Sequence, residues 1–231
     1  MSRGVDLDVT AIRPAHDPEA LLSLVDCALD AIGFEKLPSI EALRLDFLTE
    51  WLKEGDRCVA LTQTRNGWQY LYDTTFSTAE LANAVSAGLR DTLVLQFNLQ
   101  EETDFTFRVV KGGTALMEFS RGAEHFGWTG AAGKASSWDA TRAETIAGVL
   151  GASAKALAAP LEKIKAGQKG ERVGKGPRVR YVGGVQDGVQ EFAAALGMPH
   201  LYRFFEGWMK SDLDWEEDEV NTVRAYRRRG S

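Results

Sequence analysis

The residues best suited to chemistry lie near the end of the chain, in the segment SDLDWEEDEV at 211–220. Six of its ten residues are acidic, and four arginines follow within the next nine positions. Every second residue from Asp212 to Asp218 is acidic, which is the ligand spacing of a calcium loop. Glu217 stands where such a loop needs glycine, however, and Val223 stands where it needs a bidentate glutamate. We therefore predict no metal site here.

A helix explains the same run better. Asp214 is suited to the N-cap, Glu217 occupies the capping-box position, and acidic residues fill the first turn. The arginines would end the helix, where the helix dipole favours positive charge; they are Arg224, Arg227, Arg228 and Arg229. The acidic start of this predicted helix, with Trp215 and Glu216 beside Asp214 and Glu217, is a candidate docking surface for a basic protein.

A second candidate site lies in the Gly/Ser-rich loop at 122–140. His125 follows Glu124 in RGAEHFGW, at the end of a predicted strand, where a general base is often found. The sequence shows no nucleophile that could act with Glu124 and His125. An enzyme that uses these two residues is therefore kept as an alternative to a binding protein. Trp128 and Trp138 lie in the same loop and are candidate anchors for a protein partner.

A third candidate is a basic segment at 163–180, which carries seven basic residues and one acid among glycines. Clustered positive charge can neutralise the phosphates of a nucleic acid. The preceding stretch at 145–164 has the Ala, Gly and Leu spacing of a helical corner, with Pro160 expected to interrupt its second helix. The basic candidates are Lys163, Lys165, Lys169, Arg172, Lys175, Arg178 and Arg180.

Composition and charge argue against some classes of protein. The chain has 231 residues, 44% of them hydrophobic, and a net charge of −6 at pH 7. That charge argues against a nucleic-acid protein as a whole, although its distribution is uneven: −7 for residues 1–56 and +4 for residues 122–210. Cys27 and Cys58 form no metal-ligand pattern, so we expect buried, reduced thiols. No apolar run approaches the roughly 18 residues of a membrane span, which predicts a cytoplasmic protein.

The sequence also predicts the helices and strands that must position these residues. A helix is expected from Asp17 to about Gly33, and Asn66-Gly67 joins two β-like runs as a hairpin. A meander follows at 92–120. The predicted fold is α+β, with an antiparallel sheet of about five strands, helices on one face of it, and a helical C-terminal portion. The expected division is a sheet domain at 1–121, the loop at 122–140, and the helical portion at 141–231.

This layout, with GWQYLYD on the hairpin and FAAALGMP on a later helix, resembles bacterial α+β proteins of the toxin-immunity type. The resemblance implies a protein partner and carries over no site residues. We therefore predict a non-enzymatic protein-binding module without a cofactor, with an immunity or inhibitor protein as the specific expectation. The enzyme and the nucleic-acid-binding protein stay as alternatives.

Overall fold

The structure is a computed structural model, and it describes most of the chain. The described residues are 7–44, 52–73, 79–100, 104–121, 126–130, 135–136, 144–145, 147–148, 150–167, 169–172, 179–182, 185–198 and 220–230.

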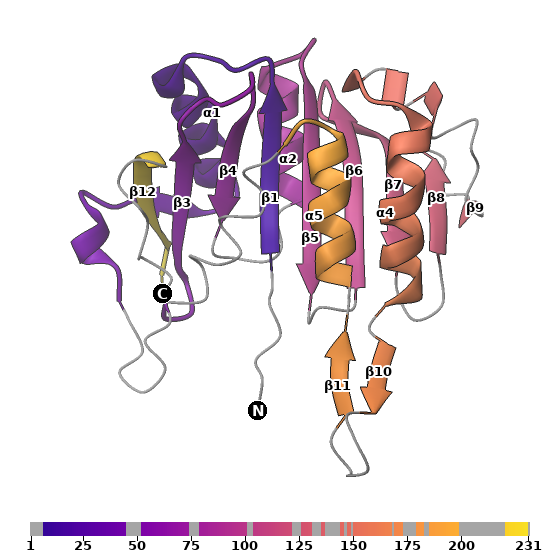
Figure 1. Cartoon of the computed structure of the whole chain (residues 1–231). Coiled ribbons are helices and arrows are strands. Elements are labelled where there is room, and N and C mark those ends of the chain that lie inside the picture. The colour runs from indigo at the N-terminus through magenta and orange to yellow at the C-terminus, as the bar shows by residue number, and fades with distance from the viewer. Residues whose placement is uncertain are drawn as a thin grey trace.

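Within these residues the dominant element is one antiparallel sheet of ten strands, in the order β2-β12-β3-β4-β1-β5-β6-β7-β8-β9 (Figure 1). The strands are β1 (Leu7–Arg13), β2 (Phe34–Lys36), β3 (Asp56–Thr62), β4 (Gln69–Asp73), β5 (Leu93–Gln100), β6 (Asp104–Lys111), β7 (Thr114–Arg121), β8 (Phe126–Gly130), β9 (Ala135–Ser136) and β12 (Val220–Arg228). The α+β class and the antiparallel sheet are confirmed, but the expected number of strands is too low. Part of the undercount arises because β8 and β9 lie in a Gly/Ser-rich segment that lacks strand periodicity, because β2 has only three residues, and because β12 carries a charge pattern that predicts a helix.

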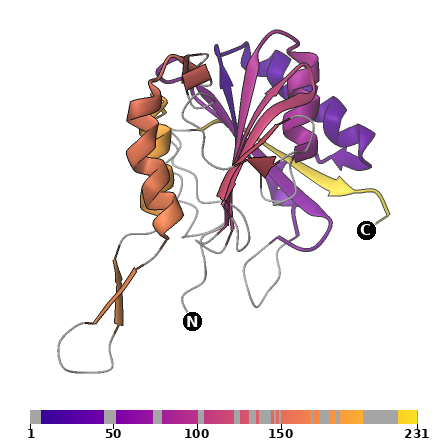
Figure 2. The same ribbon diagram turned by 90° about the vertical axis from the view of Figure 1, so that its right-hand side faces the viewer.

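Helices cover both faces of this sheet. The described helices are α1 (Pro18–Ala31), α2 (Ala79–Gly88), α4 (Ala154–Ala166), α5 (Val185–Ala195) and the short 3-10 helix η1 (Ile40–Ala42). In Figure 2 the sheet stands between α1 and α2 on one side and α4 and α5 on the other. The prediction of helices on one face is therefore wrong.

Strand alternation produces these two cores. On β5, Leu95 and Phe97 point to the α4–α5 side, whereas Val94 points to the α1–α2 side. Their partners on β1 alternate in the same way, since Val9 pairs with Phe97 and Ile12 pairs with Val94. A central strand that is apolar on both faces must be covered on both faces.

Two local predictions are confirmed. Asp17 caps α1 by accepting a hydrogen bond from the Ala20 amide at 2.9 Å. The turn between β3 and β4 contains Asn66 and Gly67, both with positive φ (51° and 75°), as a tight hairpin requires.

The end of the chain differs from the prediction. Arg224, Arg227 and Arg228 lie on strand β12, which pairs with β3 on one side and with β2 on the other. The expected terminal helix is wrong for these residues. Val220, Thr222 and Tyr226 are strand-forming residues on alternate positions, and here tertiary pairing outweighs the charge pattern that favoured a helix.

The portion after residue 141 is therefore not wholly helical. Besides β12 it contains a separate two-stranded sheet, β10 (Lys169–Arg172) and β11 (Val179–Val182). The division of the chain into domains stays a prediction.

Candidate functional site

The basic segment forms a hairpin that lies apart from the large sheet. In both views it extends away from the lower ends of α4 and α5, which it connects (Figures 1 and 2). We call β10 and β11 together the basic hairpin. Three of the predicted basic residues lie on its described strands, namely Lys169, Arg172 and Arg180. Lys175 and Arg178 lie outside the described residues.

The register of the basic hairpin distributes this charge. Lys169 pairs with Val182, Glu171 with Arg180, and Arg172 with Val179. Glu171 is thus the register partner of Arg180, and basic residues occur on both strands of a narrow two-stranded ribbon.

The other two basic candidates lie at the C-terminal end of α4. The Lys163 ammonium donates to the Glu191 carboxylate of α5, with both side chains about half exposed. Lys163 and Lys165 also stand in the last turn, where positive charge favours the helix dipole. Lys163 therefore has a structural role in joining α4 to α5.

The corner at 145–164 packs into the core. Ser153 caps α4 by accepting a hydrogen bond from the Ala156 amide at 3.1 Å, and the helix continues through Pro160. The expected interruption at Pro160 is therefore wrong. The buried side chains of α4 face the sheet and α5; they are Leu157, Pro160, Leu161 and Ile164. A helix whose apolar face is covered in this way leaves only its outer face to meet a partner.

Most of the other predicted site residues lie outside the described part of the chain. These residues are Glu124, His125, Trp138, Asp214, Trp215, Glu216 and Glu217. Trp128 lies on β8, paired in register with Phe119 and Ser136. The catalytic roles of Glu124 and His125 and the docking roles of the other residues stay predictions.

Several acids near the start of the chain pair with arginines of β12 or next to it. Arg224 bonds Asp26 at 2.6 Å and Glu19 at 2.8 Å, and the Tyr226 hydroxyl donates to Asp26 at 2.7 Å. Arg229 also pairs with Asp30 of α1. Burial alone would raise the pKa of Asp26, but the hydrogen bonds from Tyr226 and Lys36 and the charge of Arg224 lower it. The acids of α1 therefore hold the end of the chain against the helix.

Buried ion pairs tie the same edge of the sheet together. Arg57 bonds both carboxylate oxygens of Asp73, and neither side chain is more than 4% exposed. Asp56 accepts from Arg44 at 2.7 Å and from Arg227 at 2.9 Å. Paired in this way, these carboxylates stabilise strand pairing and have little freedom to act as bases.

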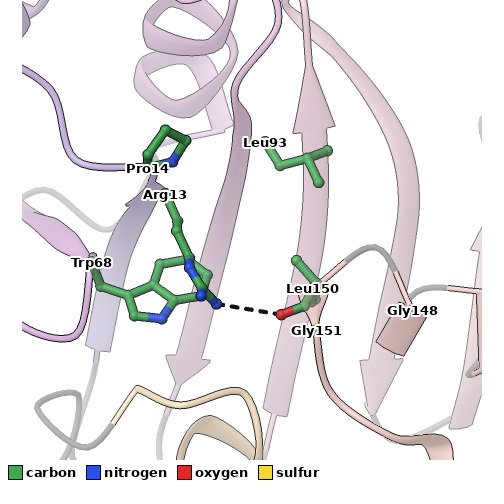
Figure 3. A pocket seen from close by; sticks show the side chains of 7 residues that line it. All are labelled: Arg13, Pro14, Trp68, Leu93, Gly148, Leu150 and Gly151. Atoms are coloured by element: carbon green, nitrogen blue, oxygen red, sulfur yellow. Dashed lines mark hydrogen bonds between the residues drawn. The ribbon is translucent and has the colours of Figure 1, made fainter.

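One pocket that the sequence analysis did not anticipate lies at the end of β1 (Figure 3). It measures about 370 Å³ and is lined by Arg13, Pro14, Trp68, Leu93, Gly148, Leu150 and Gly151. The Arg13 guanidinium carbon lies 5.4 Å from the centre of the Trp68 ring, and one of its nitrogens donates to the Leu150 carbonyl at 3.5 Å. Four separate segments of the chain meet here, so no local motif signals the pocket.

Metal-ligating side chains do not cluster in the described residues. No group of three or more His, Cys, Asp or Glu side chains among them is arranged to hold a metal ion. Neither cysteine is part of a disulfide; Cys58 is buried as expected, but Cys27 is exposed on α1, contrary to the prediction. No helix in the described ranges is long and apolar enough to cross a membrane.

Fold and site together define a layered α+β protein with a helix-covered antiparallel sheet and a projecting basic hairpin. Comparison with protein-family models, curated proteins and solved structures finds no match to this chain.

Proposed function

We propose that this chain is a nucleic-acid-binding protein that contacts a phosphate backbone through the basic hairpin. The observation that supports this best is the placement of Lys169, Arg172 and Arg180 on a two-stranded ribbon that stands clear of the large sheet. A ribbon of this kind is narrow enough to enter the major groove of duplex DNA. Basic residues on both of its strands suit contact with the phosphates on either side of a groove.

The negative net charge of the whole chain does not oppose this proposal. The six acids of 211–220 equal the entire net charge of −6, so the rest of the chain is neutral overall. Charges act over a Debye length of about 8 Å at physiological salt. The local field at the hairpin therefore depends on its own basic residues far more than on the total.

The test is the salt dependence of binding to a fluorescently labelled DNA duplex. We expect binding at about 50 mM salt that weakens steeply by about 200 mM, because each phosphate contact releases counterions. The triple variant K169A/R172A/R180A should give a slope of log Kobs against log salt that is shallower by about 2 to 3 units.

A matched control removes the same charge elsewhere. K53A/R90A/K111A alters three exposed basic residues outside the hairpin. This control variant should bind the DNA duplex nearly as tightly as the unaltered chain does. Failure of the unaltered chain to bind at low salt, or an equal loss in both variants, would reject the proposal.

A second candidate function is the non-enzymatic protein-binding module, in the form of an immunity or inhibitor protein with an acidic surface. It is favoured by the concentration of six acids and Trp215 within ten residues. Such a surface would attract a basic partner. D214N/E216Q/E217Q should then lose a protein partner that co-purifies with the unaltered chain, whereas the hairpin variant should retain it. A cytoplasmic location stays a prediction under either function.

A further inference from the structure

The pocket at the end of β1 is built around a cation held against an aromatic ring. In Figure 3 the Arg13 side chain crosses the Trp68 ring and points toward Leu150. The Trp68 side chain is 1% exposed, so the ring that supports the guanidinium is part of the core. The cation–π contact and the Leu150 carbonyl together hold the guanidinium in place at the pocket wall.

No carboxylate among the described residues pairs with Arg13, whereas Arg44, Arg57 and Arg224 each bond an aspartate. A guanidinium has five N–H donors, and the 3.5 Å contact to Leu150, which is the hydrogen bond that the Arg13 side chain makes within the described ranges, uses one of them weakly. A planar cation with free donors can form paired hydrogen bonds with a carboxylate.

The remaining walls are apolar. Pro14, Leu93 and Leu150 contribute hydrocarbon surface, and Gly148 and Gly151 leave room where side chains would otherwise stand. A volume of about 370 Å³ lies within the range of small-molecule sites. An apolar cavity with one fixed cation suits a ligand with one anionic group and a compact apolar body.

We infer that this pocket binds a small apolar carboxylate, with the carboxylate on the Arg13 guanidinium that Trp68 supports and the apolar body against Pro14, Leu93 and Leu150. Di- and triphosphates fit less well, because the described lining residues include one cation, Arg13, and no lysine or histidine. The inference is independent of the basic hairpin, which lies on a different part of the molecule (Figure 1).

The first experiment compares two probes of nearly equal shape on the unaltered protein. By titration calorimetry, 2-naphthoate should bind with a Kd on the order of 0.1 mM. The neutral 2-naphthalenemethanol should bind at least about tenfold more weakly, since it has no negative charge to pair with Arg13. Equal affinities for the two probes, or no binding of 2-naphthoate at millimolar concentration, would overturn the inference.

The second experiment locates the site. In protein labelled with 5-fluorotryptophan, 2-naphthoate should shift chiefly the ¹⁹F resonance that is missing in W68F. R13Q should weaken 2-naphthoate at least tenfold, while R229Q, which makes the same charge change at an exposed ion pair, should not. Shifts confined to other tryptophans, or an equal effect of both variants, would place the ligand elsewhere and reject the site.

Discussion

At the residue scale, Asp56 shows how this protein uses its buried charge. Its side chain is fully buried at the start of β3, between Arg44 and Arg227. Burial alone would raise the pKa of Asp56, but hydrogen bonds from Arg227 and Arg44 outweigh it and hold the pKa well below its ordinary value. The Arg44 amide adds a further bond at 2.6 Å. One carboxylate thus joins the chain before β3 to the final strand β12.

The sign of this shift predicts a pH dependence. Because the pKa is lower in the folded protein than in the unfolded chain, where it is near 3.9, Asp56 stabilises the fold above about pH 5 and loses that effect as the pH falls below about 4. Asp56→Asn should cost about 3 kcal/mol at pH 7, and the difference from the unaltered protein should shrink toward pH 2.

Urea unfolding across this pH range measures the effect. Asp30→Asn is the control, because its ion pair with Arg229 is more than half exposed on both sides and should contribute less than about 1 kcal/mol. A cost for Asp56→Asn that does not change with pH would contradict the assigned ionisation.

At the element scale, α4 and α5 approach each other closely at Gly188 of α5. A methyl group at Gly188 would lie 2.7 Å from Ile164 Cγ1, 2.8 Å from the Ile164 amide nitrogen and 3.0 Å from the Pro160 carbonyl. Two of these three contacts are to backbone atoms, which cannot move aside cheaply. The glycine therefore sets the spacing of the two helices that cover this face of the sheet.

Gly188→Ala should consequently destabilise the protein by about 2 kcal/mol, since overpacking outweighs the gain of about 1 kcal/mol in helix propensity. Gly148→Ala is the matched comparison, because nothing lies within 4 Å of its added methyl group, and it should be neutral or slightly stabilising. Thermal or urea unfolding of the two variants checks this. Equal stabilities would mean that the α4–α5 contact readily adjusts.

At the scale of the whole molecule, the sheet is completed by the last strand of the chain. β12 lies between β2 (Phe34–Lys36) and β3 (Asp56–Thr62), which are far from it in the sequence. Tyr226 of β12 is 1% exposed and belongs to the core shared with α1 and α2. The two ends of the chain therefore depend on each other for folding.

A chain ending at residue 219 should lack a cooperative unfolding transition, because it loses Tyr226 from the core and leaves the buried Asp56 without Arg227. Near-ultraviolet circular dichroism during heating measures this. Removing only Gly230 and Ser231 should leave the transition intact. A cooperative transition at an unchanged temperature in the shorter chain would show that β12 is dispensable.

Local signals predicted the parts of the fold that depend on local physics. Asp17 and Pro18 mark the start of α1, and Asn66-Gly67 marks the hairpin. In both cases the interaction that decides the structure lies within a few residues of the signal. The candidate pocket had no such signal, since Arg13, Trp68, Leu93 and Leu150 come from four distant segments.

The sequence by itself determined the α+β class, the antiparallel pairing of the early strands, and the concentration of positive charge at 163–180. Only the tertiary structure decided that helices cover both faces, that Arg224, Arg227 and Arg228 lie on a strand, and that Arg224 meets two acids of α1. The reason is physical. Helix caps and turns are settled by short-range sterics and hydrogen bonds, whereas the conformation of β12 depends on β2 and β3, whose unpaired backbone groups it satisfies.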